Sequence, residues 1–171
     1  MKKLIYCSSC GANNSFSYID GNDRYHCKSC KSIHYQNPKP TATLICPKDD
    51  EILLVQRAYE PGKGEWGLPG GFLELGETLI EGAKRELKEE TNLDGDVVWI
   101  LGSCSHFNSI FGDILLLGLE IKINNWDNLV AGDDALDACF FKIEDCPSLA
   151  FECHQKIFKI YTEKFYKKWE F

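Results

Sequence analysis

Three glutamates stand close together in the stretch Arg-Glu-Leu-Lys-Glu-Glu at residues 85–90. On a helix, residues three and four positions apart share one face, so Glu86, Glu89 and Glu90 would gather their carboxylates within about one turn. Adjacent anions repel one another, but the arrangement is favourable where hard divalent cations with oxygen ligands bind. The alternative interpretation is a solvated, glutamate-rich helix.

A loop and a helix must position these carboxylates. Residues 59–71 contain five glycines and two prolines, which indicate a loop. Residues 78–91 have helical spacing, with an apolar side made of Leu79, Ile80, Ala83 and Leu87. Packing of that side against a core would hold the carboxylates still.

The spacing resembles the Nudix box of the Nudix hydrolase family, which is glycine, five residues, glutamate, seven residues and then Arg-Glu-aliphatic-x-Glu-Glu. The matching positions are Gly71, Glu77, Arg85, Glu86, Leu87, Glu89, Glu90 and Leu93. The family pattern has glycine where this chain has Asn92. A left-handed backbone is expected at that helix end, and asparagine adopts it more readily than most residues, so we expect little functional effect.

The resemblance implies the roles of these residues. Mg²⁺ or Mn²⁺ would be bound by the backbone carbonyl of Gly70 and by the carboxylates of Glu86, Glu89 and Glu90. Structural support for the loop and helix would come from Gly71, Glu77 and Arg85. Water would attack one phosphorus of a diphosphate linked to another group, with metal ions neutralising the phosphate oxygens.

A further acidic residue is implied by the same resemblance, because many Nudix enzymes carry one on the loop before the last strand. That loop here reads Gly-Asp-Asp-Ala-Leu-Asp. Asp134 is the catalytic candidate, together with Glu86 and Glu89, and Asp133 and Asp137 are alternatives to it. A turn with solvated aspartates is the competing interpretation.

Two matched cysteine pairs predict a zinc site. Cys7-x-x-Cys10 and Cys27-x-x-Cys30 are separated by sixteen residues, so two tight turns would present four thiolates to one tetrahedral Zn²⁺. With four sulfur ligands this zinc would be structural. Free thiols, a redox pair and an iron site stay open as alternatives. The other cysteines are expected to be small core residues: Cys46, Cys104, Cys139, Cys146 and Cys153.

The chain divides into three parts. Residues 1–36 are poor in aliphatic side chains and form the predicted zinc ribbon, and the two prolines of residues 37–40 indicate a linker. Residues 41–171 form the predicted Nudix domain, with strands expected at 41–46, 51–57, 97–101, 114–123 and 135–143 and helices at 78–91 and 151–169. The first two strands would form a hairpin. This order predicts an α/β fold, and the resemblance implies an α/β/α sandwich with a mixed sheet.

Substrate choice depends on the residues outside the box. Residues 56–71 and 149–154 resemble a zinc-ribbon subgroup of Nudix enzymes that includes ADP-ribose, FAD and NADH pyrophosphatases. NADH pyrophosphatases carry a Ser-Gln-Pro-Trp array after the box, which is missing from this chain. The resemblance therefore implies hydrolysis of ADP-ribose or FAD with release of AMP.

Side chains for substrate binding can also be nominated. Arg57 ends a strand before the glycine loop, and we expect it to contact a substrate phosphate. Phe107 is the candidate for stacking on adenine, with Tyr59 and Trp126 as alternatives. The histidines at 106 and 154 have no ligand-spaced partner and are expected to be structural.

Composition limits the partners. The net charge is −7, and neither a long apolar run nor a signal-peptide core is present, so we expect a cytoplasmic protein that binds a small nucleotide diphosphate and neither membrane nor nucleic acid. Alternatives are an NADH or NAD-capped RNA pyrophosphatase, nucleoside triphosphate housecleaning and a non-catalytic Nudix-fold sensor. Whether the ribbon supports a homodimer stays open.

Overall fold

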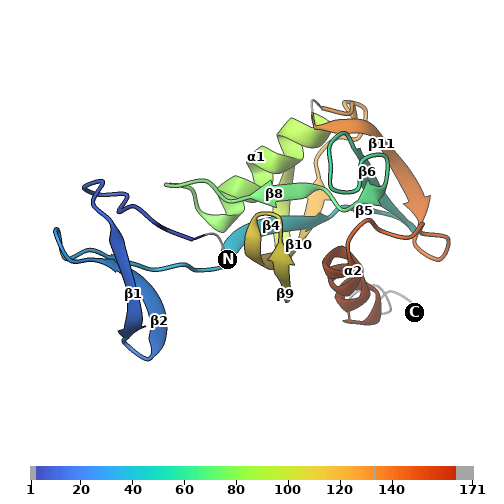
Figure 1. Ribbon diagram of the computed structural model, residues 1–171. Helices are drawn as coiled ribbons and strands as arrows, with labels where there is room; N and C mark the ends of the chain where they lie inside the picture. Colours follow the sequence, from blue (N-terminus) through green and yellow to red (C-terminus); the bar gives the residue numbers. More distant parts are fainter. Residues whose placement is uncertain (1–2, 133, 165–171) are drawn as a thin grey trace. The chain divides into compact units, whose positions relative to one another are not determined.

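The chain divides into two compact units, Met1–Pro38 and Lys39–Phe171. A computed structural model describes residues 3–132 and 134–164 of it (Figure 1). Within the described helices, no segment has the length and apolar character needed to cross a bilayer.

The first unit is a small antiparallel sheet with the order β1-β2-β3. Its strands are β1 (Asn14–Ile19), β2 (Asn22–Cys27) and β3 (Ile33–His34). Asp20 and Gly21 form the β1–β2 turn with φ angles of 50° and 81°, as a tight hairpin of this twist requires. Among the described residues of this unit, only Cys7 and Cys27 are buried. The unit therefore lacks an aliphatic core.

The second unit contains two sheets. One has the order β8-β4-β10-β9 and consists of β8 (Gly70–Phe72), β4 (Lys39–Ile45), β10 (Gly112–Ile123) and β9 (Gly95–Ser109). The other has the order β11-β6-β5, with β7 on β6, and consists of β11 (Ala135–Lys142), β6 (Glu51–Arg57), β5 (Pro47–Lys48) and β7 (Trp66–Gly67). β4 and β10 are parallel, and their other partners are antiparallel. The first sheet is thus mixed.

Two helices, α1 (Leu79–Thr91) and α2 (Glu152–Lys164), lie on opposite sides of the strands (Figure 1). β4 connects the two halves of the core because successive side chains point to opposite faces of a strand. Leu44 belongs to the cluster that contains Leu87 of α1, and Ile45 to the cluster that contains Ile157 of α2. The predicted α/β/α sandwich is confirmed.

The predicted hairpin between residues 41–46 and 51–57 is wrong. β4 pairs with β8 and β10, whereas β6 pairs with the two-residue strand β5. β4 is a central strand with residues 41–45 buried, so both of its edges are occupied by other partners. The chain passes to the second sheet at Cys46.

The element boundaries also differ from the expectations. Lys39 and Pro40, assigned to the linker, begin β4, where proline is tolerated because it lies close to the start of the strand. β9 extends far beyond the expected residues 97–101. Ile80, assigned to the apolar side of α1, is 50% exposed. Residues 165–169 of the expected last helix lie outside the described residues.

Candidate active site

Both ends of α1 are fixed by local hydrogen bonds. The Thr78 hydroxyl accepts from the Glu81 amide at 3.2 Å, and the Glu81 carboxylate accepts from the Thr78 amide at 2.7 Å, which is a capping box. At the other end Asn92 has φ 56° and ψ 14°, and its amide donates to the Lys88 carbonyl. The left-handed backbone expected at Asn92 is confirmed, so the departure from glycine leaves the helix end intact.

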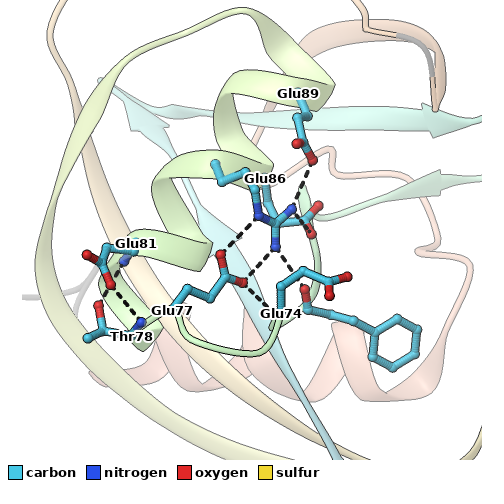
Figure 2. A network of polar contacts seen from close by, with 8 residues as sticks. Glu74, Glu77, Thr78, Glu81, Glu86 and Glu89 are labelled. Atoms are coloured by element: carbon cyan, nitrogen blue, oxygen red, sulfur yellow. Dashed lines mark hydrogen bonds and ion pairs between the residues drawn. The ribbon is translucent and has the colours of Figure 1, made fainter.

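Arg85 joins the segment before α1 to the helix itself through three carboxylates, those of Glu77, Glu86 and Glu89, which Figure 2 shows. Its Nε and Nη2 atoms donate to the two oxygens of Glu77 at 3.0 and 2.8 Å, and Nη2 also donates to the Phe72 carbonyl at 3.0 Å. Its Nη1 atom donates to Glu86 at 2.7 Å and to Glu89 at 2.9 Å. The hydrogen bonds from Arg85, followed by one from the Glu74 amide, lower the pKa of Glu77 to about 2. Glu77 is therefore a permanently ionised anchor for Arg85.

Glu86, Glu89 and Glu90 form a group that we call the carboxylate cluster. The Gly70 amide donates to Glu90 Oε2 at 2.7 Å. Burial raises the pKa of Glu90 to about 8; the hydrogen bond from Gly70 opposes this shift, and the charges of Glu86 and Asp134 add to it. Burial also raises the pKa of Glu86, against the hydrogen bond from Arg85. Burial thus disfavours the ionised forms of Glu86 and Glu90 in the absence of a nearby cation.

Three glycines near the carboxylate cluster, Gly70 and Gly71 in β8 and Gly132 before β11, lie so close to neighbouring atoms that a side chain would not fit there. A Cβ at Gly71 would lie 2.5 Å from Glu86 Oε2, and a Cβ at Gly70, whose φ is +133°, would overlap the Ala42 carbonyl oxygen. A Cβ at Gly132 would likewise overlap the Glu89 carbonyl oxygen. Gly71 thus lets the backbone approach the Glu86 carboxylate, whereas Gly70 and Gly132 allow close backbone contacts with β4 and with α1.

A cavity of about 440 Å³ opens beside the cluster. It is lined by most of the residues that the sequence nominated: Arg57, Gly70, Gly71, Arg85, Glu86, Glu89, Glu90 and Asp134. Asp134 is exposed, and its backbone carbonyl accepts from the Ala58 amide at 3.2 Å. Arg57 is held by a hydrogen bond from Nε to the Pro61 carbonyl at 2.9 Å.

Other nominated residues do not reach this cavity. Phe107 is 64% exposed and is absent from the cavity lining. Trp126 packs against Phe140, and the Asp137 carboxylate accepts hydrogen bonds from its own strand. Asp133 lies outside the described residues. Of the alternatives for stacking, Tyr59 lines the cavity.

The two histidines beside the cavity have different surroundings. His154 Nδ1 accepts from the Leu68 amide at 3.1 Å, in agreement with its expected structural role. Burial, followed by the charges of Arg57 and His106, lowers the pKa of His154 to about 4. His106 lies with its ring centroid 6.5 Å from that of Phe151 and lines the cavity. A neutral His154 therefore fixes the backbone at Leu68, two residues before Gly70.

The carboxylate cluster suits a hard divalent cation. Its members offer carboxylate oxygens from one helix face, and the raised pKa values of Glu86 and Glu90 indicate that their charge is poorly compensated. A bound cation would supply the compensation and favour the ionised forms. The residues present therefore fit Mg²⁺ or Mn²⁺.

The four N-terminal cysteines fit zinc. Their sulfur atoms lie within 4.8 Å of one another, with 3.6 Å between Cys7 and Cys30 and 3.5 Å between Cys10 and Cys27. Tetrahedral Zn²⁺ with bonds of about 2.3 Å would separate its sulfur ligands by about 3.8 Å. The turns after the first and third cysteines are alike, because Gly11 and Lys31 have φ angles of 75° and 65°.

The two cysteine turns close with the same backbone hydrogen bond. The amides of Gly11 and Lys31 donate to the carbonyls of Cys7 and Cys27, each at 2.9 Å. The second turn thus closes with a left-handed lysine, where the first uses glycine. The remaining cysteines divide into buried Cys46 and Cys153 and the partly exposed Cys104, Cys139 and Cys146.

Known proteins resemble the chain over most of its length. The NUDIX domain model matches residues 38–161. An ADP-ribose pyrophosphatase from Methanocaldococcus jannaschii is 42% identical over 135 residues, which cover 74% of this chain and 75% of that protein. The NAD-capped RNA hydrolase NudC from Vibrio atlanticus is 33% identical over 102 residues, which cover 60% of this chain but only 37% of NudC.

Solved structures agree with the sequence comparison. The crystal structure of a NUDIX hydrolase from Nitrosomonas europaea superposes with a TM-score of 0.83 at 30% identity and covers 96% of this chain and 93% of that chain. A bifunctional NMN adenylyltransferase/ADP ribose pyrophosphatase from Francisella tularensis, complexed with AMP and a manganese ion, superposes with a TM-score of 0.61 at 28% identity over 76% of this chain and 42% of that chain. The chain therefore belongs to the NUDIX family and is a Nudix pyrophosphohydrolase.

Proposed function

We propose that this protein hydrolyses ADP-ribose to AMP and ribose 5-phosphate with the help of Mg²⁺ or Mn²⁺. The observation that carries the proposal is the convergence of the carboxylate cluster, Gly70 and Arg57 on one cavity. The similarity to the Methanocaldococcus jannaschii ADP-ribose pyrophosphatase supports the choice of substrate. The AMP and manganese in the Francisella tularensis structure fit the same chemistry.

Several polar groups at the cavity have roles in this reaction. Glu86, Glu89 and Glu90, with the Gly70 carbonyl, would hold the metal. When bound, the metal supplies charge neutralisation of the diphosphate and lowers the pKa of water. Arg57 binds a phosphate oxygen, for which a guanidinium is well suited.

Hydrolysis then needs an acceptor for one proton. A water oxygen forms a bond to one phosphorus, and the bond from that phosphorus to the bridging oxygen breaks, so that two phosphate monoesters leave. The carboxylate of Asp134 lines the cavity and takes the proton from the attacking water. Arg85 does not touch the substrate in this scheme; it holds Glu86 and Glu89 in place.

The cysteine cluster of the first unit would bind one structural Zn²⁺. Four thiolates fill a tetrahedral coordination shell and leave no open position for a substrate. The near absence of buried side chains in this unit supports a metal as its stabilising element.

A second candidate reaction is favoured by the NudC relatives. The 33% identity to the Vibrio atlanticus enzyme suggests the diphosphate of an NAD-capped RNA end as a substrate, and NADH contains the same diphosphate. The chain spans about a third of NudC, so this candidate ranks below ADP-ribose. FAD remains a third substrate to be tested because the residues around the glycine loop resemble those of FAD pyrophosphatases.

A product analysis tests these proposals. Purified protein with Mg²⁺ would be incubated separately with ADP-ribose, FAD, NADH and NAD-capped RNA, and the products separated by chromatography. We expect AMP and ribose 5-phosphate from ADP-ribose at the highest kcat/KM. Glu86→Gln should lower kcat at least about a hundredfold, while the matched Glu163→Gln change on α2 should leave it unaltered. Failure of the wild-type protein to cleave ADP-ribose would contradict the proposed function.

Glu86→Gln also separates an enzyme from a nucleotide sensor. An enzyme variant of this kind keeps substrate binding and loses turnover, and calorimetry with ADP-ribose measures the first independently of the second. Binding without any turnover by the wild-type protein, at saturating Mg²⁺ and Mn²⁺, would indicate a sensor.

A further inference from the structure

The tip of the β9–β10 hairpin places an aromatic side chain at the active-site cavity. Ser109, Ile110 and Phe111 line the cavity beside the carboxylate cluster. Side chains fix this turn, since the Ser109 hydroxyl donates to the Gly112 carbonyl at 2.5 Å and accepts from the Phe111 amide at 3.1 Å. The backbone of Phe111 is therefore held in position by the turn.

Phe111 also contacts β8, the strand that carries Gly70 and Gly71. Its ring centroid lies 5.4 Å from that of Phe72, with 74° between the ring planes, which is an edge-to-face pair. Phe72 follows Gly70 by two residues in β8, so its backbone lies about 7 Å further along the strand. Within a nucleotide, one ribose separates the phosphate from the base by a comparable distance.

These apolar side chains remain accessible although they line a cavity. Phe111 is 47% exposed and Ile110 is 70% exposed. Neither belongs to one of the two core clusters. An exposed aromatic ring beside polar catalytic groups is typical of a ligand site, because a planar base that stacks on it removes apolar area from water.

We propose that Phe111, together with Phe72 and Ile110, forms the subsite for the nucleobase of the substrate. This inference rests on the proposed hydrolysis of a nucleotide diphosphate and adds the group that recognises its base. It transfers the stacking role nominated for Phe107 to a residue four positions later in the chain.

Steady-state kinetics with ADP-ribose test the subsite. Phe111→Ala should raise KM about tenfold or more, the effect of losing one base-aromatic stack, while kcat changes less than about twofold. Trp99→Ala is the matched control, because Trp99 is a 59% exposed aromatic residue of β9 outside the cavity. Phe111→Leu keeps an apolar side chain at the tip and should have an intermediate KM.

Direct binding provides a second measurement that needs no turnover. Etheno-AMP, a fluorescent analogue of AMP, should bind the wild-type protein with quenched emission, and Phe111→Ala should weaken this binding about tenfold or more. Equal etheno-AMP affinity of Phe111→Ala and Trp99→Ala would overturn the subsite even if ADP-ribose is cleaved. Retained stacking of etheno-AMP on Phe111, with no cleavage of ADP-ribose, would instead overturn the proposed function alone.

Discussion

Arg85 and Glu77 form a two-point ion pair, with Nε to Oε2 at 3.0 Å and Nη2 to Oε1 at 2.8 Å. The same guanidinium also reaches Glu86 and Glu89. Lysine retains the charge but offers no planar fork, so it cannot hold all three carboxylates. We predict that Arg85→Lys lowers kcat about ten- to a hundredfold and weakens Mn²⁺ binding, measured by titration calorimetry.

Lys84→Gln provides the control for this prediction. Lys84 precedes Arg85 on α1 and pairs with Asp96 at 2.6 Å, but both side chains of this pair are largely exposed. Exposed pairs contribute little, so kcat and Mn²⁺ affinity should not change. Equal losses in both variants would show that helix charge, and not the geometry of Arg85, matters.

The cysteine cluster predicts one zinc per chain. Cys7→Ser should abolish this zinc, measured by elemental analysis, and should unfold the first unit, because Cys7 and Cys27 are the only buried side chains among residues 3–38. In an NMR spectrum, the amide signals of this unit should then lose their chemical-shift dispersion. Cys139→Ser, outside the cluster, should keep the zinc. Purified protein with no zinc, or with zinc retained in Cys7→Ser, would contradict the site.

The half-buried acceptor His154 predicts a pH dependence of stability. Its pKa is lowered from 6.5 to about 4 in the folded protein, so the unfolded chain binds a proton more readily between these values. Stability is therefore full above pH 6.5 and falls as the pH drops toward 4, by up to about 3 kcal/mol. Urea unfolding at pH 7 and pH 4.5 measures this loss.

His154→Gln tests the assignment of that pH dependence. Glutamine can still accept the hydrogen bond from the Leu68 amide but does not titrate. The variant should lose less stability than the wild-type protein between the two pH values. An identical loss in both proteins would assign the dependence to other groups.

The close approach of Gly71 to Glu86 predicts a specific defect. A Cβ at this position would lie 2.5 Å from the Glu86 carboxylate, so Gly71→Ala should displace that carboxylate and lower Mn²⁺ affinity about tenfold or more. Gly67→Ala is the matched control, because its Cβ would meet His154 at an ordinary 3.4 Å. Equal Mn²⁺ affinity in the two variants would argue against Glu86 as a metal ligand.

The catalytic helix could be predicted from sequence because its determinants are local. The glutamate spacing, the Thr78 cap and the tolerance of Asn92 for a left-handed backbone depend on residues within a few positions of one another. The same holds for the two cysteine turns. For such features, residue type and spacing contain the necessary information.

Features that depend on pairing between distant segments were harder to predict. Only residues 97–101 of β9 were predicted as a strand, because the second half of β9 is polar and lies at an edge of the sheet. β9 and β10 also contain register shifts, for example between Gly118 and Leu119. A shift of one residue reverses the face on which a side chain lies, so the sequence does not show which side chains near the hairpin tip line the cavity.

The parallel pairing of β4 with β10 has a consequence for the synthesis of this protein. Thr41 pairs with Leu116 on one side and with Phe72 on the other. During translation, β4 can pair with β8 early, but it stays without its second neighbour until β10 has left the ribosome. Contacts between such distant residues slow folding. The sheet that holds Gly70 and Gly71 is thus completed only late, after most of the domain has been made.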